Sequence, residues 1–108
     1  MDKREIMYIA NIQLNEEEIL PKLIEEMAEL TQMVTKFLVG DIRIDSMAGE
    51  AADVRIMLDQ FMLMVEEEYP GFIDLIDKKE LQKIDRQFER IKEKLCAQQK
   101  HTSIDTRG

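Results

Sequence analysis

The chain has 108 residues, and 15 Lys and Arg against 23 Asp and Glu give it a formal net charge of −8. This length allows one compact domain, and the acidic balance disfavours general nucleic-acid binding because phosphate backbones are repelled. The single cysteine, Cys96, excludes an intramolecular disulfide and a cysteine-based zinc cluster. No apolar run approaches the ~20 residues of a membrane span, and the N-terminus lacks a secretory signal pattern, so we expect a cytoplasmic protein without membrane contact.

The first part of the chain contains one clear helix and an ambiguous segment before it. Residues 5–14 fit either a helical turn or a short strand. Asn15 has the character of a helix N-cap, and Pro21 is tolerated near a helix start but kinks the first turn. We therefore place the main helix from about residue 21 to residue 38, with Gly40 as its stop signal.

The remainder of the chain predicts two further helices. Asp45 or Ser46 caps a helix that runs to about Tyr69, and Pro70-Gly71 forms the turn that follows. The last helix extends from about residue 78 to residue 98.

These helices predict an all-α fold, a small four-helix-type bundle over residues 1–96 with a loose tail over residues 97–108, where periodicity is lost. A single copy has a thin core, and the helix ending at Tyr69 is apolar on several faces, so we expect oligomerisation to complete the bundle. The predicted core stripes are Leu20, Leu23, Met27, Leu30, Val34 and Leu38 in the main helix, Met47, Ala51, Val54, Leu58, Phe61 and Val65 in the next, and Leu81, Ile84, Phe88, Ile91 and Leu95 in the last.

Two pairs of carboxylates lie on the two central helices. Glu26 and Glu29 form one pair and Glu50 and Asp53 the other, and residues three apart share a helix face. If the two helices pack antiparallel through their short loop, the pairs face each other. Four converging carboxylates suit Mg²⁺ or Mn²⁺.

Acidic residues on a helix are usually only solvated, and Glu25, which points to solvent, fits that interpretation. Glu50 does not, because it projects into the apolar stripe beside Val54, where an unpaired carboxylate is costly. A carboxylate in that position needs a neutralising partner, and a metal ion is the simplest one.

The segment Glu25-Glu26-x-x-Glu29, followed after twenty residues by Glu50-x-x-Asp53, resembles the EExxE…ExxD signature of the MazG-like all-α nucleoside triphosphate pyrophosphohydrolases. The flanking sequences IEEMAEL and GEAADVRIMLDQF are similar to those of typical members, and the resemblance spans about residues 19–95.

The resemblance implies that Glu26, Glu29, Glu50 and Asp53 hold Mg²⁺, with Glu25 as a supporting acid. It implies cleavage of a nucleoside triphosphate between the α and β phosphates, in a homodimer or homotetramer. Glu25 or Glu29 would orient or deprotonate the attacking water. Metal-activated water requires no protein nucleophile, and neither Cys96 nor the one histidine, His101, offers a nucleophile pair.

The last helix carries a basic flank whose segment Lys83-Ile84-Asp85-Arg86-Gln87-Phe88 resembles a segment of some MazG domains that approaches the triphosphate. A solvated face is the alternative interpretation. Arg86 is the stronger candidate, since a guanidinium matches phosphate bidentately, and Lys36 is a weaker one. Met33, Phe37 and Met57 form an apolar slot for a base or belong to the core, and base specificity stays open.

We therefore expect a Mg²⁺-dependent nucleoside triphosphate pyrophosphohydrolase that cleans the nucleotide pool. The alternatives are a non-catalytic helical interaction or regulatory protein, whose acids are surface charge, and an enzyme of the phosphoribosyl-ATP pyrophosphatase type.

Overall fold

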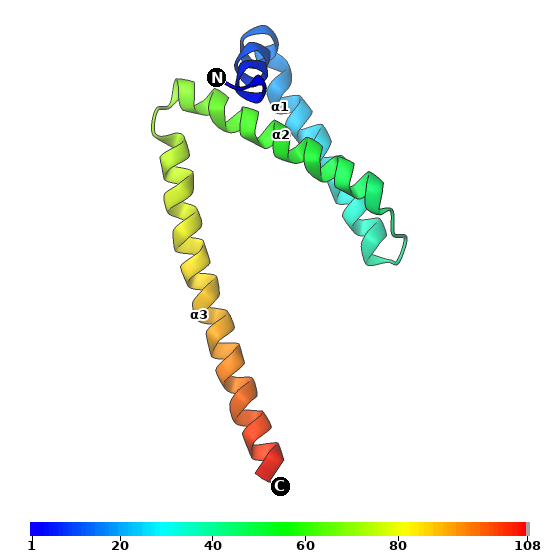
Figure 1. The fold of residues 1–108 in the computed structure, drawn as a ribbon, viewed down its shortest axis with the longest axis vertical. Coiled ribbons are helices and arrows are strands. Elements are labelled where there is room, and N and C mark those ends of the chain that lie inside the picture. Colours follow the sequence, from blue (N-terminus) through cyan, green and yellow to red (C-terminus); the bar gives the residue numbers. More distant parts are fainter. Residues whose placement is uncertain (108) are drawn as a thin grey trace. The chain divides into compact units, whose positions relative to one another are not determined.

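The computed structural model describes the backbone of residues 1–107 and the side chains of residues 1–99. The described chain consists of three helices and no strand, namely α1 (Lys3–Leu38), α2 (Ile44–Glu68) and α3 (Phe72–Arg107) (Figure 1). The all-α prediction is confirmed, but the described part has three helices where a four-helix bundle was predicted. It divides into two units, Met1–Phe72, which contains α1 and α2, and Ile73–Gly108.

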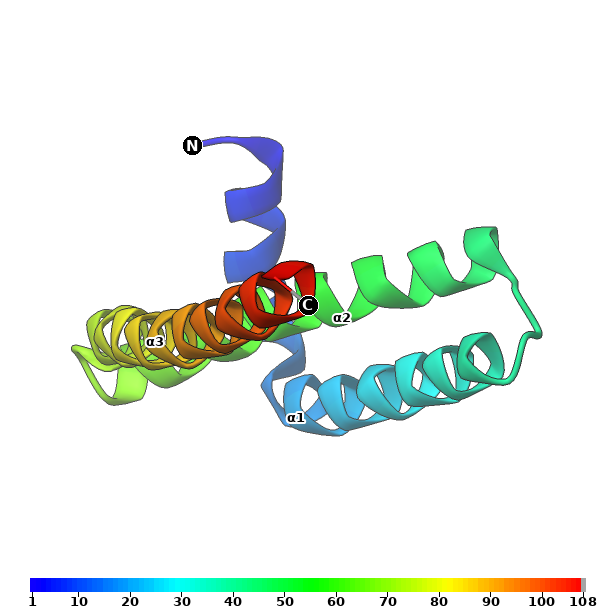
Figure 2. The same cartoon turned by 90° about the horizontal axis from the view of Figure 1, so that it is seen from below.

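The ambiguous segment before Asn15 is helical and forms the beginning of α1. Asp2 caps this helix, accepting a hydrogen bond on Oδ1 from the Glu5 amide at 2.9 Å. Asn15 has non-helical angles (φ −132°, ψ 35°), and the segment before it is steeply inclined to the rest of α1 (Figure 2). The sequence predicted Asn15 as the N-cap of a main helix that begins at about residue 21, and this prediction is wrong. The helix begins at Lys3 and continues through Asn15, which interrupts it and whose side chain donates to Asn11 Oδ1 at 2.8 Å.

The end of α1 is a Schellman turn around Gly40, as the sequence predicts. The Gly40 amide donates to the Phe37 carbonyl at 3.1 Å and the Asp41 amide donates to the Lys36 carbonyl at 2.8 Å. Gly40 has φ +91°, a conformation that side chains with a Cβ rarely adopt. The turn leads directly into α2, so it determines how α2 returns along α1.

Two predicted boundaries differ from the structure. Neither Asp45 nor Ser46 caps α2, because the helix already begins at Ile44, after Arg43, without a side-chain cap. The Pro70-Gly71 turn is present, but α3 starts directly after it and not at residue 78. Phe72, Ile73 and Ile76 lie at helical spacing and are half-buried, so the sequence carried a signal for this first turn and a half that the prediction did not use.

The predicted end of the last helix also differs, because α3 extends to Arg107 and not to about residue 98. The domain over residues 1–96 and the loose tail over residues 97–108 stay predictions. Residue 108 and the side chains of residues 100–107 lie outside the described residues.

The core of the first unit lies where α1 packs against α2. Ile19, Leu23 and Met57 are buried in it, and Phe61 and Met64 pack against them. The sequence placed Leu20, Met27, Val34 and Leu38 in the core, yet all four are exposed. Leu23 is buried as predicted. A helix with one neighbour buries one face, and in α1 Ile19 and Glu26 share that face with Leu23.

A polar link holds the N-terminal segment of α1 to α2. Asn11 Nδ2 donates to Gln60 Oε1, and Gln60 is only 2% exposed. Tyr8 and Ile12 are buried next to this link along the chain, so the segment before Asn15 has its own packed face. No helix of the described chain is long and apolar enough to cross a membrane.

Candidate metal centre

Three carboxylates from two helices meet between α1 and α2. Glu26 and Glu29 come from α1 and Glu50 from α2, and one oxygen of each lies within 4.8 Å of the others. They meet because the turn at Gly40 sends α2 back along α1, so residues at similar distances from the turn lie opposite each other. The antiparallel arrangement assumed from the sequence is therefore present.

The carboxylates are partly withdrawn from solvent. Glu26 is 5% exposed, and Glu29 and Glu50 are half-buried. Glu26 Oε2 and Glu50 Oε2 are buried and have no hydrogen-bond partner. A buried carboxylate oxygen without a partner is costly, and a cation between the two helices would remove that cost.

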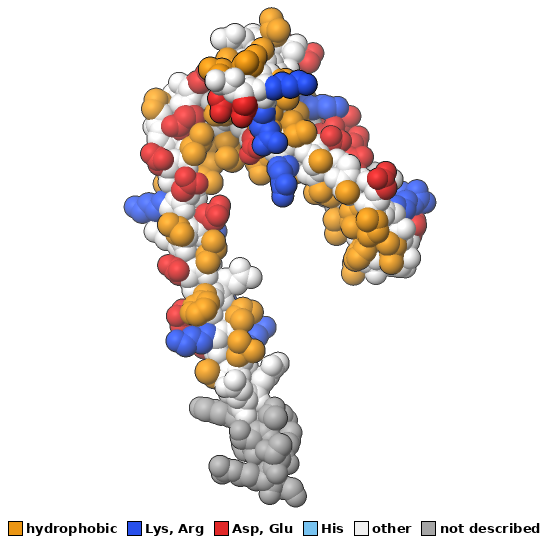
Figure 3. All heavy atoms as spheres, viewed as in Figure 1, with side chains coloured by type: hydrophobic (Ala, Val, Ile, Leu, Met, Phe, Trp, Pro, Cys, Tyr) orange, Lys and Arg blue, Asp and Glu red, His pale blue; other side chains and the backbone are white. Residues whose placement is uncertain are grey.

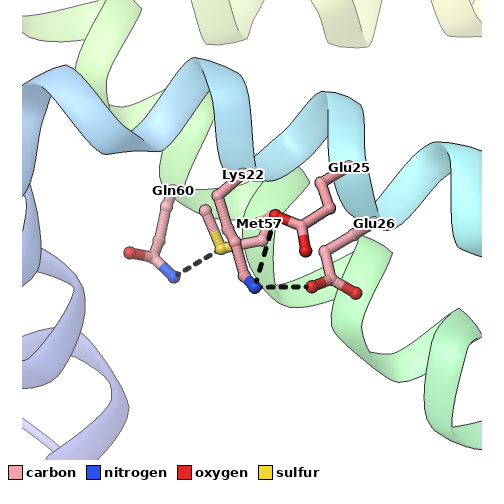
Figure 4. Close-up of polar contacts among 5 residues, drawn as sticks. All are labelled: Lys22, Glu25, Glu26, Met57 and Gln60. Carbon is pink, nitrogen blue, oxygen red and sulfur yellow. Dashed lines mark hydrogen bonds and ion pairs between the residues drawn. The ribbon is translucent and has the colours of Figure 1, made fainter.

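Lys22 is the cation next to this cluster. Its Nζ lies 3.1 Å from Glu26 Oε1 and 3.7 Å from Glu25 Oε2 (Figure 4). The hydrogen bond from Lys22 lowers the pKa of Glu26, although burial acts in the opposite direction. The same hydrogen bond, with the charge of Glu25, raises the pKa of Lys22. Lys22 thus keeps Glu26 ionised, and its single charge leaves the other acids uncompensated.

Glu29 and Glu50 form the pair with the strongest mutual effect. The Glu50 carboxylate, which accepts a hydrogen bond from protonated Glu29, raises the pKa of Glu29 to about 7. Burial and the charge of Glu26 act in the same direction. Around pH 7 Glu29 is therefore about half protonated, and a cation that binds there must displace this proton.

The other two acids of the predicted site lie outside this group of three. Glu25 is mostly exposed and pairs with Lys22, in agreement with its predicted orientation toward solvent. Asp53 is also exposed, but its carboxyl adds to the effect of Lys22 in lowering the pKa of Glu26, so it lies near the cluster.

The predicted base-binding residues divide between core and surface. Met57 belongs to the buried core, and its sulfur accepts a hydrogen bond from Gln60 Nε2 at 3.7 Å (Figure 4). Met33 and Lys36 are half-buried on α1, and Phe37 is exposed. The core interpretation of Met57 agrees with its burial, and the roles of these residues toward a substrate stay predictions.

The basic residues of the last helix lie in the other unit of the chain. Lys83 and Arg86 are exposed on α3 and line a groove along the surface of that helix, together with Arg90 and Lys94. Their predicted contact with a triphosphate stays a prediction.

Sequence reasoning missed Lys22 and a cavity beside it. The spacing of Lys22 and Glu26, four residues apart on one helix, is a signal that could have predicted their ion pair. The cavity has a volume of about 250 Å³ and lies at the break in α1 at Asn15. The sequence pattern does not show which side chains this break brings together. The cavity is lined by Asn11, Asn15, Glu18, Ile19, Lys22 and Met57.

Comparison of the chain with protein-family models, with curated proteins and with solved structures gives no match. The structure thus shows an all-α protein in which Glu26, Glu29 and Glu50 meet in a cluster that could hold a metal ion.

Proposed function

We propose that the three carboxylates hold Mg²⁺ or Mn²⁺ and that the chain hydrolyses a nucleoside triphosphate between its α and β phosphates, releasing a nucleoside monophosphate and pyrophosphate. The observation that carries the metal site is the pair of buried oxygens without a partner, Glu26 Oε2 and Glu50 Oε2, beside Glu29. The choice of reaction rests on the resemblance of the EExxE…ExxD spacing to the MazG-like enzymes.

The donor set fits a hard divalent cation. Carboxylate oxygens are the protein ligands that Mg²⁺ and Mn²⁺ prefer. One oxygen of each carboxylate lies within 4.8 Å of the others, so the three side chains can reach a common cation. Asp53, near Glu26, is the fourth ligand that the resemblance implies.

A bound divalent cation would lower the pKa of a water molecule and offset the charge of phosphate oxygens. The residues of the chain would handle the proton. Glu29, or Glu25 beside it, would accept the proton of the attacking water, as the resemblance implies. Glu25, which is mostly exposed and pairs with Lys22, would orient that water.

Substrate binding requires cations and an apolar surface in addition. We propose Arg86 and Lys83 of α3, and more weakly Lys36, for the triphosphate, and Met33 and Met57 for the base. An oligomer, dimer or tetramer, is part of the same proposal because many apolar side chains of the described chain are exposed.

The metal site is tested by thermal unfolding of the chain with and without Mg²⁺ and Mn²⁺. A ligand at 100 times its dissociation constant stabilises the folded state by about 2.7 kcal/mol, so we expect a clear rise in Tm for the wild type. Glu29→Gln and Glu50→Gln should lose most of this rise. Glu17→Gln on α1 and Glu67→Gln on α2 remove exposed carboxylates away from the cluster and should keep it. An equal loss in all four variants would show that the ions act on surface charge only.

The reaction is tested by the products released from each ribo- and deoxynucleoside triphosphate in the presence of Mg²⁺. Attack at the α phosphorus yields pyrophosphate and a monophosphate, so inorganic phosphate should be a minor product. A mixture dominated by nucleoside diphosphate and phosphate contradicts the proposed reaction.

The same measurements separate the two alternatives. Stabilisation by Mg²⁺ without turnover of any nucleotide favours a non-catalytic interaction or regulatory protein. Pyrophosphate release from phosphoribosyl-ATP, with none from nucleoside triphosphates, favours the biosynthetic type of enzyme.

A further inference from the structure

The helix α3 presents an unpartnered apolar seam to solvent. Five large apolar residues follow each other at alternating spacings of three and four, which is the a and d pattern of a coiled coil. Phe88, in the middle, is 62% exposed, and the other four are between 47% and 65% exposed. Hydrophobic side chains are visible along the described part of this helix in Figure 3. The seam consists of Leu81, Ile84, Phe88, Ile91 and Leu95.

From this seam and the charges beside it we infer that α3 pairs with α3 of a second copy of the chain, in an antiparallel coiled coil. The inference is independent of the proposed reaction. The partner and its direction follow from the residues that flank the seam at the e and g positions of the heptad, because these residues meet across such an interface.

A parallel pairing in register places like charges together. With Leu81 and Phe88 at a positions, Glu80 occupies a g position and Asp85 the next e position. In a parallel dimer, g faces the following e of the other helix, so Glu80 would meet Asp85 of the second copy, twice by symmetry. The next contacts, Gln87 with Lys92 and Lys94 with Gln99, gain no ion pair to offset this repulsion.

An antiparallel pairing turns the same residues into opposite-charge contacts. Here e faces e and g faces g, while a layers pack against d layers. With Phe88 opposite Ile91 and Ile84 opposite Leu95 of the second copy, Asp85 faces Lys92, again twice by symmetry. Gln87 faces Lys94, which is neutral toward association. The charge pattern therefore selects the antiparallel dimer.

A shift by one heptad is less favourable. It sets Glu80 opposite Lys94 of the second copy, but it also sets Asp85 opposite Asp85 and Lys78 opposite Lys92, and it packs the charged Asp77 against Leu95. The favoured register also leaves Arg86 at an f position, opposite the seam, so association does not cover it.

A charge exchange tests the pairing in the full chain. Asp85→Lys places lysines opposite each other and Lys92→Asp places aspartates opposite each other, so each single variant should raise the dimer dissociation constant about tenfold. The double variant Asp85→Lys/Lys92→Asp restores both pairs and should return to within about twofold of the wild type. Glu89→Lys makes the same change of charge at a b position outside the interface and should have little effect. Dissociation constants are measured by sedimentation equilibrium.

The result that would overturn the inference is a double variant at least as weak as the single variants, because no exchanged pair would then exist. A wild-type chain that stays monomeric at all concentrations, or a Phe88→Glu variant that associates like the wild type, would overturn it equally.

The direction of the helices is tested by spin-label distances, which do not depend on any destabilising substitution. Cys96 is the free, exposed cysteine of the described chain and accepts a label directly. In the antiparallel register it lies opposite Lys83 of the second copy, so the two labels are displaced by about 20 Å along the axis. A label on Glu89→Cys in a Cys96→Ser chain lies opposite Arg90 and gives a short distance. Short distances from both labels would show a parallel dimer and contradict the proposal.

Discussion

At the scale of single residues, the carboxyl group of Glu50 affects the protonation of Glu29, and this effect can be measured. The two side chains come from different helices and share a partly buried position, so ionising both at once is unfavourable. The pKa of Glu26 is lowered instead, because the Lys22 ammonium group lies 3.1 Å from its carboxylate. The same sequence motif therefore contains one acid whose pKa is lowered and one whose pKa is raised to about 7, so that it titrates near neutral pH.

This difference predicts how the stability of the metal-free chain depends on pH. The pKa of Glu29 is raised from its usual 4.5 to about 7, so the folded chain keeps a proton that the unfolded chain releases. The stability from this proton is complete below pH 4.5 and is lost as the pH rises through 7. We expect the free energy of unfolding to fall over this window, as measured by urea titration.

The other shifted groups act outside that window. The lowered pKa of Glu26 gives stability above its usual value of 4.5 that is lost at lower pH, and the raised pKa of Lys22 acts at alkaline pH, above 10.5. Glu29→Gln should therefore flatten the curve between pH 4.5 and 7, and Glu17→Gln should leave it unchanged. A wild-type curve that rises over this range would contradict the shared proton.

Glu50→Gln and Asp53→Asn provide the corresponding test of activity. Both substitutions keep the size of the side chain and remove negative charge from a crowded acidic group. We expect metal-dependent hydrolysis to be abolished while the metal-free fold is kept or becomes more stable. Pyrophosphate release and circular dichroism report the two effects separately, and full activity in both variants would contradict the assignment of the metal site.

At the scale of elements, glycines at two positions have opposite roles. Gly40 ends α1 with φ +91°, whereas Gly49 lies inside α2, and an added Cβ would meet no atom within 4 Å at either position. The backbone alone therefore decides the effect of a substitution. Gly40→Ala should destabilise the chain by about 1–2 kcal/mol, because a Cβ disfavours this conformation.

Gly49→Ala should instead stabilise the chain by up to about 1 kcal/mol, since alanine is the better residue inside a helix. Chemical denaturation of both variants measures the contrast. Equal effects of the two substitutions would show that the turn at Gly40 does not require its left-handed conformation.

The helix stripes show where element-level reasoning works and where it stops. Periodicity correctly indicated helices with an apolar side, and the glycine stop signal placed the end of α1. Periodicity did not identify the buried side fully. It predicted Leu20 in the core, but α2 covers the neighbouring Ile19 and leaves Leu20 exposed. The orientation of a helix about its own axis is determined by its neighbour, which lies elsewhere in the sequence.

At the scale of the whole molecule, the main question is what covers the exposed apolar residues. Besides the seam of α3, hydrophobic side chains gather at the end of the first unit, around the α1–α2 loop (Figure 3). Leu38, Val39, Ile42 and Ile44 are all exposed there. Surfaces of this kind usually mark contacts with other chains. The exposed residues thus agree with an oligomer whose subunits complete each other's cores.

Whether α3 binds the substrate can be tested by substitutions on this helix. If Arg86 contacts the triphosphate, Arg86→Ala should lower kcat/KM by roughly ten- to a hundredfold, which corresponds to about 1.5–3 kcal/mol for a charge-assisted hydrogen bond. Lys79→Ala removes the same charge from α3 outside the groove that Arg86 lines, and should have a much smaller effect. Equal small losses of kcat/KM in both variants that fade with added salt would indicate a general effect of positive charge. Arg86 would then be an ordinary solvated surface residue.

The sequence alone determined the helical class, the stop at Gly40, the Pro70-Gly71 turn and the acids Glu26, Glu29 and Glu50 as a candidate group. These follow from local rules, because helix propensity, glycine conformation and residue spacing act within a few positions of the chain. Only the tertiary structure decided that Asp53 stays exposed, that Lys22 pairs with Glu26, and that Glu50 raises the pKa of Glu29. These properties depend on how deeply α2 covers each side chain of α1, and burial between helices is set by packing and not by spacing along one chain.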